Sequence, residues 1–263
     1  MKREWNIFLS ALSFFTRIPV KIAEGQIVEL SLSVRYFPLV GWLAGTLSAL
    51  IFFSFDMVFG QSLAIIFSML STIFLTGALH EDGLADVCDG FGGGWTRDKI
   101  LEIMKDSCIG TYGVIGLVFI TSFKFFAIQQ IVSNLNISTQ WSLLICMLVL
   151  ANTLSRFNAI TMIFTHTYVR AEKSKSAPMV HNVKISNLYI ALIITLIPLF
   201  TLLFYTQQYK WVFVLFPLAI VNLFLSRYFN KWIGGYTGDC LGAIQQISEV
   251  VVYLSIICLW KFF

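Results

Sequence analysis

Long apolar runs alternate with short polar segments along almost the whole chain. A helix that crosses a bilayer needs about 20 mostly apolar residues. Seven runs meet or approach that length: 37–59, 61–79, 113–132, 141–164, 188–206, 211–229 and 249–262. The last run is short, so its helix is expected to begin earlier. The first two meet at Gly60, which leaves room only for a helical hairpin.

The N-terminal run from Trp5 to Val20 is apolar but is interrupted by Arg17 and Pro19. It lacks the small-residue cleavage site of a signal peptide and continues into charged sequence, so we expect an interfacial or re-entrant helix. The pattern predicts an all-α fold, a polytopic integral membrane bundle of about seven transmembrane helices plus this N-terminal helix. No linker divides it, so residues 1–263 are expected to form a single membrane-embedded catalytic domain.

The composition agrees with a membrane protein and excludes several other classes. Of the 263 residues, 57% are hydrophobic and 12% are charged, whereas soluble domains have about 25% charged residues. The five cysteines are scattered without a CxxC pair, so they predict neither a disulfide framework nor a zinc site. The formal net charge of +4 is too small to indicate nucleic-acid binding.

Lysine and arginine are distributed unevenly over the connecting segments, which predicts an orientation. With the N-terminus inside, the outer segments hold only Lys210 and Lys261. This arrangement places two cytoplasmic polar loops, 80–112 and 230–248, on the same side of the membrane. We expect a multi-pass membrane protein with both loops facing the cytoplasm.

The first of these loops holds half of the fourteen acidic residues. Asp82, Asp86 and Asp89 are spaced i, i+4 and i+7, so a helix would place their carboxylates on one face, where like charges repel. A divalent cation would remove the repulsion, and all-oxygen ligands favour Mg²⁺, with Mn²⁺ as the other candidate. We predict a metal site formed by Glu81, Asp82, Asp86, Asp89 and Asp106. The alternative is a solvated acidic face.

A glycine run follows the acids. Gly92, Gly93 and Gly94 would let backbone N–H groups approach an anion closely. No G-K-[ST] sequence follows, so a Walker-type site is not supported. Residues 97–106 then predict an amphipathic helix.

The second polar loop contains Asp239, for which two roles are open. It could cap the final helix, or it could take part in the site. Asp239, Gln246 and Glu249 would share one helical face, which could meet the acidic loop.

Two basic residues, Lys124 and Arg156, lie inside predicted spans, where an ionisable residue indicates function by default. Arg156, beside Asn152 and Asn158, is the stronger candidate for a functional role. Snorkelling or an internal ion pair is the simpler explanation for Lys124, with Asp56 as a candidate partner.

Three polar motifs carry a family resemblance. His80–Gly94 (HEDGLADVCDGFGGG), Leu101–Gly113 (LEIMKDSCIGTYG) and Gly234–Ala243 (GGYTGDCLGA) resemble signatures of the cobalamin synthase family, also called adenosylcobinamide-GDP ribazoletransferase or cobalamin 5′-phosphate synthase. FFTRIPV (14–20) and YFPLVGWLAG (36–45) resemble its N-terminal blocks, so the resemblance covers nearly the whole chain. The chain departs from the family at Cys108, where a basic residue is usual.

The resemblance implies a Mg²⁺-dependent transferase of vitamin B12 synthesis. Such an enzyme moves adenosylcobinamide phosphate from adenosylcobinamide-GDP to α-ribazole or its 5′-phosphate, giving adenosylcobalamin or its 5′-phosphate and GMP. An alcohol attacks a diphosphate, which requires mainly positioning and charge neutralisation. The implied partners are the corrinoid nucleotide and α-ribazole, the lipid bilayer and no nucleic acid, together with a homo-oligomer or other corrinoid-assembly enzymes.

On these motifs we assign catalytic roles to Asp82, Lys105 and Asp239. We assign substrate binding to Arg17, Gly92, Gly93, Gly110, Thr111, Arg156 and Thr237.

Three other functions are considered. A membrane metal-dependent phosphotransferase acting on a lipid alcohol would use the same chemistry, and DVCDG (86–90) partly matches such enzymes. An ion-coupled transporter would place its site near the bilayer midplane on discontinuous helices, whereas we expect the acids at the cytoplasmic edge. A non-catalytic scaffold would not need clustered acids.

Overall fold

The computed structural model describes residues 2–20, 30–170 and 183–262, and the statements below concern these ranges. The main helices are α1 (Lys2–Phe15), α3 (Phe37–Phe59), α4 (Gln61–Thr76), α5 (Leu79–Gly93), α6 (Arg97–Ile103), α7 (Thr111–Ser133), α8 (Ile137–Thr165), α10 (Ile185–Thr206), α11 (Leu215–Ile233) and α12 (Gly238–Phe262). Three short helices join them: α2 (Leu30–Ser33), η1 (Val34–Tyr36) and η2 (Tyr209–Val214).

The described chain contains six stretches that are long and apolar enough to cross a membrane. They are Leu30–Phe59, Thr111–Ser133, Ile137–Thr165, Ile185–Thr206, Tyr209–Ile233 and Gly238–Phe262. Helices α4 and α5 pass the same test only as a pair that is bent by 88°. This confirms the predicted all-α polytopic bundle of about seven spans, and the final span does begin earlier than its apolar run.

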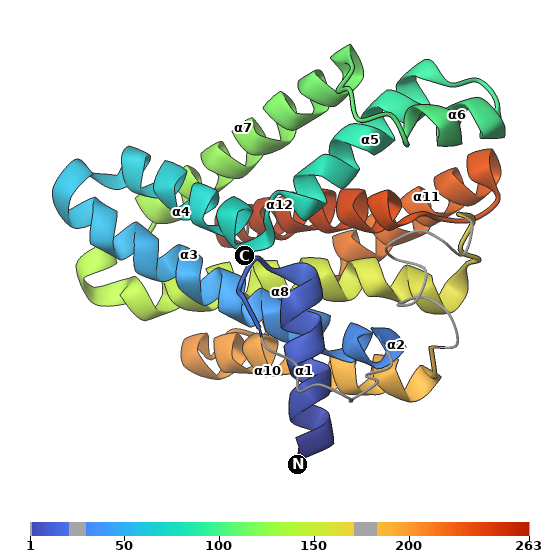
Figure 1. Ribbon diagram of the computed structural model, residues 1–263. Helices are drawn as coiled ribbons and strands as arrows, with labels where there is room; N and C mark the ends of the chain where they lie inside the picture. The colour runs from blue at the N-terminus through green and yellow to red at the C-terminus, as the bar shows by residue number, and fades with distance from the viewer. Residues whose placement is uncertain (1, 21–29, 171–182, 263) are drawn as a thin grey trace.

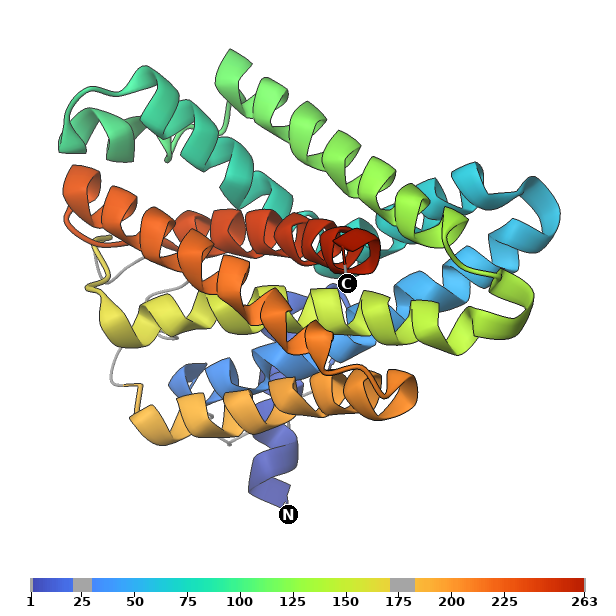
Figure 2. The same cartoon turned by 180° about the vertical axis from the view of Figure 1, so that it is seen from behind.

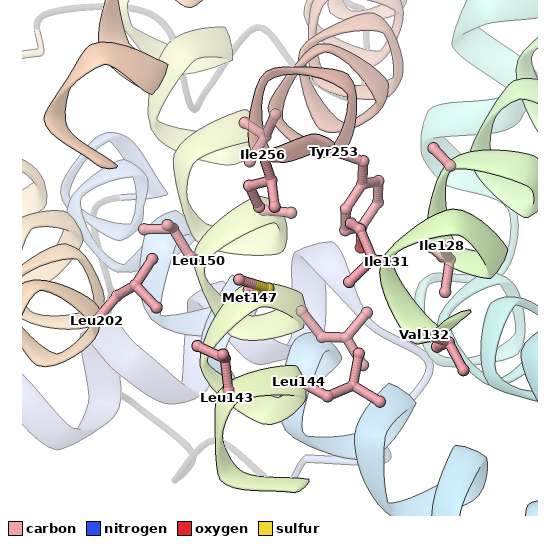
Figure 3. Packing of buried hydrophobic residues seen from close by; sticks show 14 of the residues in the cluster. Ile128, Ile131, Val132, Leu143, Leu144, Met147, Leu150, Leu202, Tyr253 and Ile256 are labelled. Carbon is pink, nitrogen blue, oxygen red and sulfur yellow. The ribbon is translucent and has the colours of Figure 1, made fainter. Parts of the chain in front are cut away.

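Helices α8 and α12 form the centre of the bundle (Figures 1 and 2). The most apolar window of α8 is 78% buried and that of α12 is 67% buried, whereas the value is 28% for α7 and α10 and 22% for the span that contains α11. Figure 3 shows the aliphatic core between α7, α8, α10 and α12, with Met147 and Leu150 of α8 beside Ile256 of α12. Outer helices with so little burial present most of their apolar surface to lipid.

Helix α3 packs closely on α8 because two glycines face it. A Cβ atom at Gly41 would lie 2.6 Å from the carbonyl oxygen of Asn152, and one at Gly45 would lie 2.5 Å from the Cα of Val149. Glycines four residues apart are the small-residue pattern that lets membrane helices approach backbone to backbone.

Helix α1 crosses α3 and α8 instead of running alongside them (Figure 1). Glu4 of α1 forms a 2.7 Å ion pair with Arg35 and accepts a 2.9 Å hydrogen bond from the Tyr36 hydroxyl. Trp5 is 60% exposed. A helix that lies across the bundle with an exposed tryptophan agrees with the expected interfacial helix.

The chain bends sharply between α4 and α5. Gly77 (φ 65°) and Ala78 (φ 58°) both adopt the left-handed conformation there. The backbone N–H of Arg17 donates to the carbonyl of Leu75 (2.7 Å), and the Arg17 side chain lies against Gly77 so closely that a Cβ would collide with it. The segment after α1 therefore packs on the bend from which α5 begins.

Most of the two predicted polar loops is helical, which corrects their description as loops. Residues 80–93 belong to α5 and residues 238–248 to α12. The reason is packing, because Leu84, Val87 and Ile244 enter one hydrophobic cluster between these helices.

Candidate active site

The two polar motifs meet where α5 crosses the first turns of α12. A Cβ at Gly83 would lie 3.0 Å from the Cα and carbonyl oxygen of Asp239, and one at Gly242 would lie 3.1 Å from the carbonyl oxygen of His80. Because both contact positions are glycine, the two backbones nearly touch. The structure thus confirms that the start of α12 faces the acidic segment.

Four carboxylates and one arginine gather at this crossing. Asp86, half-buried on α5, interacts electrostatically with Asp239, Asp82, Asp89 and Arg170. Asp82 is exposed and has no ion pair or side-chain hydrogen bond within the described ranges. The site therefore has an excess of negative charge, because one arginine faces several carboxylates.

Arg170 is the site residue that the sequence did not single out. Its Nη2 atom lies 2.6 Å from Oδ2 of Asp239 and 2.9 Å from the carbonyl oxygen of Met104, at the end of α6. The segment before it is fixed by backbone hydrogen bonds of 3.0 Å between Val169 and Tyr236 and between Tyr236 and Thr167. In the sequence Arg170 is only one of several basic residues in an inner loop, so nothing distinguishes it.

Thr237, not Asp239, caps α12. The hydroxyl oxygen of Thr237 accepts a hydrogen bond from the backbone N–H of Cys240 (3.3 Å), which is the geometry of a helix N-cap. The same hydroxyl donates to Oδ2 of Asp239 (3.3 Å). The alternative in which Asp239 is the cap is therefore wrong, and its carboxylate faces Arg170 instead.

Asp89 holds the start of α7. Its two carboxylate oxygens accept hydrogen bonds from the backbone N–H groups of Gly110 (2.7 Å) and Gly113 (2.8 Å). A Cβ at Gly110 would lie 2.5 Å from Oδ1 of Asp89, so the contact requires glycine there. Thr111, also predicted to bind substrate, is exposed in the first turn of α7.

The glycine run closes α5 instead of forming an open loop. Gly92 and Gly93 lie in its last turn, and the N–H of Gly94 donates to the carbonyl of Gly90 (2.9 Å). A Cβ at Gly92 would lie 2.6 Å from the ring of Tyr112. In this position the glycines give α6 and α7 room to pack against α5.

Glu81 points into the bundle, toward a buried polar network. Its Oε1 accepts a hydrogen bond from Nε2 of Gln246 (2.9 Å), whose Oε1 accepts one from Lys124 (3.0 Å). Lys124 also forms a 3.1 Å ion pair with Glu249. The internal ion pair expected for Lys124 is thus present, but its partner is Glu249 and not Asp56.

Arg156 is 2% exposed and lies beside this network. Its Nη1 donates to the carbonyl oxygen (2.8 Å) and to Oδ1 (2.9 Å) of Asn152, and its guanidinium lies 5.8 Å from the ring centre of Phe37. Three further predicted residues are exposed and away from the crossing contacts: Arg17 at the α4–α5 bend, and Lys105 and Asp106 after α6. Asp106 accepts a hydrogen bond from the N–H of Cys108 (3.0 Å).

The donors partly fit the predicted metal. Within the described ranges no three His, Cys, Asp or Glu side chains are grouped closely enough to hold an ion. Glu81 and Asp89 already accept hydrogen bonds from neighbouring helices. Asp82, Asp86 and Asp239 offer the all-carboxylate chemistry that Mg²⁺ prefers, although Asp239 is paired with Arg170.

Comparison with known proteins places the chain in a family. The family model described as cobalamin-5-phosphate synthase matches residues 7–257. No solved structure matches. Three relatives carry the name adenosylcobinamide-GDP ribazoletransferase. The protein of Shewanella amazonensis is 42% identical over 99% of this chain and 98% of its own. That of Shewanella piezotolerans is 43% identical (97% and 96%), and that of Leptospira interrogans is 39% identical (99% and 98%). With the whole bundle and both halves of the site inside the match, the chain belongs to the cobalamin-5-phosphate synthase family.

Proposed function

We propose that this protein transfers adenosylcobinamide phosphate from adenosylcobinamide-GDP to α-ribazole or α-ribazole 5′-phosphate and releases GMP. The transfer assembles the nucleotide loop of vitamin B12. The observation that carries the proposal is the crossing of α5 and α12 at Gly83, which brings Asp82 and Asp86 to Asp239 and Arg170. Carboxylates paired with a cation suit the attack of an alcohol on a diphosphate.

Each group at the crossing has a role in this reaction. The ribose hydroxyl attacks the phosphorus that is esterified to cobinamide and forms a new P–O bond. The bond from this phosphorus to the bridging oxygen of the diphosphate breaks, and GMP leaves with the bridging oxygen. The hydroxyl proton passes to a carboxylate, for which Asp239 is our candidate base. Arg170 would neutralise charge on the diphosphate after its guanidinium separates from Asp239. Asp82 and Asp86 would hold Mg²⁺, which would neutralise charge on the diphosphate.

The site is proposed to face the cytoplasm of a bacterium, at the inner membrane. The support is the distribution of lysine and arginine, which leaves only Lys210 and Lys261 in the predicted outer segments. In Figure 1, α5, α6 and the start of α12 lie together at one end of the bundle, and we propose that this end faces the cytoplasm.

A transporter deserves comparison because the bend at Gly77 is a broken helix, a feature that carriers share. The acids here lie along α5, after the break, instead of at the break itself. The family to which the chain belongs is also one of synthases. A lipid phosphotransferase would share the same carboxylate chemistry, so the substrate must be tested directly.

The experiment supplies purified protein in lipid nanodiscs with adenosylcobinamide-GDP, α-ribazole and Mg²⁺. We expect GMP release in equal amount to the joined corrinoid, abolished by chelation with EDTA and restored by Mg²⁺ or Mn²⁺. Asp82→Ala should remove most activity while the protein still purifies normally, and exposed Asp98→Asn serves as the matched control. GMP formation without the joined corrinoid, or transfer only to a lipid alcohol, would contradict the proposal.

A further inference from the structure

The four acids of α5 are bonded in two different ways. Glu81 and Asp89 are buried, and each accepts hydrogen bonds from another helix. Asp82 and Asp86 lie between them in sequence, and neither accepts a side-chain hydrogen bond or ion pair from the described residues. The four members of the predicted metal set that lie on α5 therefore divide into two that accept hydrogen bonds and two that do not, while the fifth, Asp106, lies after α6.

The bond of Glu81 connects α5 to the centre of the bundle. Gln246, which donates to Glu81, is held by Lys124 (3.0 Å) and donates also to Oε1 of Gln245 (2.9 Å). Lys124 and Glu249 form a 3.1 Å ion pair whose side chains are 7% and 5% exposed. These hydrogen bonds fix the direction of the side chains that make them, and Oε2 of Glu81 is the buried oxygen of this network that has no hydrogen-bond partner among the described residues.

The bond of Asp89 fixes the other end of α5. Its carboxylate satisfies the N–H groups of Gly110 and Gly113 at the start of α7, groups that a helix leaves without internal partners. A displaced Asp89 would leave these groups unbonded, so α5 and the start of α7 keep one relative position.

Apolar packing and polar contacts together determine the rotation of α5. The helix begins at the bend of Gly77 and Ala78, so continuity with α4 does not set its direction. Leu84 and Val87 enter the hydrophobic cluster shared with α12, but the position nearest to α12 is Gly83, which has no side chain to interlock. A rotation by one residue, about 100° on a helix, would turn Asp82 and Asp86 away from Asp239.

We propose that Glu81 and Asp89 are positioning residues that fix the rotation and axial position of α5, and that Asp82 and Asp86 are the acids presented to the reacting groups. The role of Asp82 and Asp86 rests on the proposed function. The role of Glu81 and Asp89 rests on their hydrogen bonds alone, so experiments can contradict one role without the other.

The decisive variant exchanges the two side chains of the α5–α12 bond. In Glu81→Gln/Gln246→Glu, the amide at 81 donates to the carboxylate at 246, which still accepts from Lys124 but no longer donates to Gln245. The net charge is unchanged, but position 81 has no carboxylate. We expect Glu81→Ala and Gln246→Ala each to lower kcat by about 10–100-fold, the cost of a small misplacement, with the Mg²⁺ half-saturation concentration unchanged. The exchanged pair should recover most of that loss.

Asp82→Asn and Asp86→Asn are the contrasting variants, and both should raise the Mg²⁺ half-saturation concentration. If the exchanged pair loses Mg²⁺ affinity as they do, Glu81 is a ligand and the inference is overturned. If Asp89→Asn, which keeps one acceptor oxygen, is as inactive as Asp89→Ala and shifts Mg²⁺ affinity, Asp89 is a ligand as well.

A distance measurement tests the positioning without activity. Spin labels replace exposed Trp95, just after α5, and exposed Leu254 of α12, in a background without the five native cysteines. We expect a narrow distance distribution in the wild type and the exchanged pair, and a broad one in Glu81→Ala. An unchanged distribution in Glu81→Ala would overturn the inference, whereas a lack of transferase activity in the wild type would overturn only the proposed function.

Discussion

The role of a single side chain in this protein depends more on its hydrogen-bond and ion-pair partners than on its residue type. Asp82, Asp86 and Glu81 are neighbours in sequence, yet Glu81 alone turns inward to Gln246. Helical spacing predicted that Asp82 and Asp86 share a face. It could not predict which acids find a buried donor, because that depends on α12, about 160 residues later. Arg170 escaped prediction for the same reason, since only the folded chain brings it to Asp239.

At this scale we predict that Asp239→Asn keeps its stability but loses turnover. Thr237 caps the helix, so the substitution leaves the cap intact, and the amide oxygen can still accept a hydrogen bond from Arg170. A neutral amide cannot take the proton of the ribose hydroxyl, and loss of a general base costs about 10²–10⁴ in rate. The measurements are kcat and the thermal unfolding temperature in detergent.

Exposed Asp98→Asn on α6 is the control and should change neither quantity. Wild-type turnover in Asp239→Asn would move the search for the base to Asp82 and Asp86.

Among the helices, the apolar pattern predicted the ends of α3, α7, α8 and α10 to within a few residues. It missed the bend after α4, because apolar residues continue through Gly77 to Leu79. Gly77 has the left-handed backbone with which many helices end, and its N–H donates to carbonyls of the last turn of α4. Ala78 follows in the same conformation, and Arg17 packs against Gly77. Helical α5 was likewise described as a loop because its acids and glycines are poor helix formers, although burial of Leu84 and Val87 outweighs that preference.

At the scale of a helix pair, we predict that Gly45→Leu prevents α3 from packing on α8. A Cβ there would lie 2.5 Å from the Cα of Val149, so the backbones must separate. Overpacking of this kind costs about 1–3 kcal/mol or more. The expected result is a lower unfolding temperature and less monodisperse protein by size-exclusion chromatography.

Leu43→Ala, at a position on the same helix that is 37% exposed, is the matched control. Equal yields and unfolding temperatures for the two variants would mean that the close contact at Gly45 is not required.

The whole molecule is a helical bundle in which one bent pair, α4 and α5, has its acidic residues on the second helix. Composition and apolar run lengths were sufficient to predict the fold class and the approximate number of spans. The way in which α5 crosses α12 was not predictable, since it depends on glycines that meet from distant segments.

At this scale we predict that residues 80–112 and 230–248 share the cytoplasmic face. In a background that keeps only Cys108, which is exposed, an impermeant thiol reagent should fail to label intact cells and should label inside-out vesicles. Lys231→Cys, in a background without other cysteines, should behave in the same way.

A cysteine placed at exposed Ser138, in the predicted outer loop, is the control and should give the opposite result. Labelling of position 108 or 231 from outside would reverse the orientation.

The hydrogen bonds of Asp89 to the start of α7 also constrain the chain between these two places. Asp89 and Gly110 are 21 positions apart, and their hydrogen bond closes the chain between them at its base. The segment that holds α6 therefore returns to the place where it began, and it also contacts the rest of the bundle, because Arg97 donates to the carbonyl oxygen of Ile233 and Arg170 donates to that of Met104. An insertion between Gly94 and Gly110 that keeps these contacts would leave the ends of α5 and α7 together, since the length of a closed segment costs little.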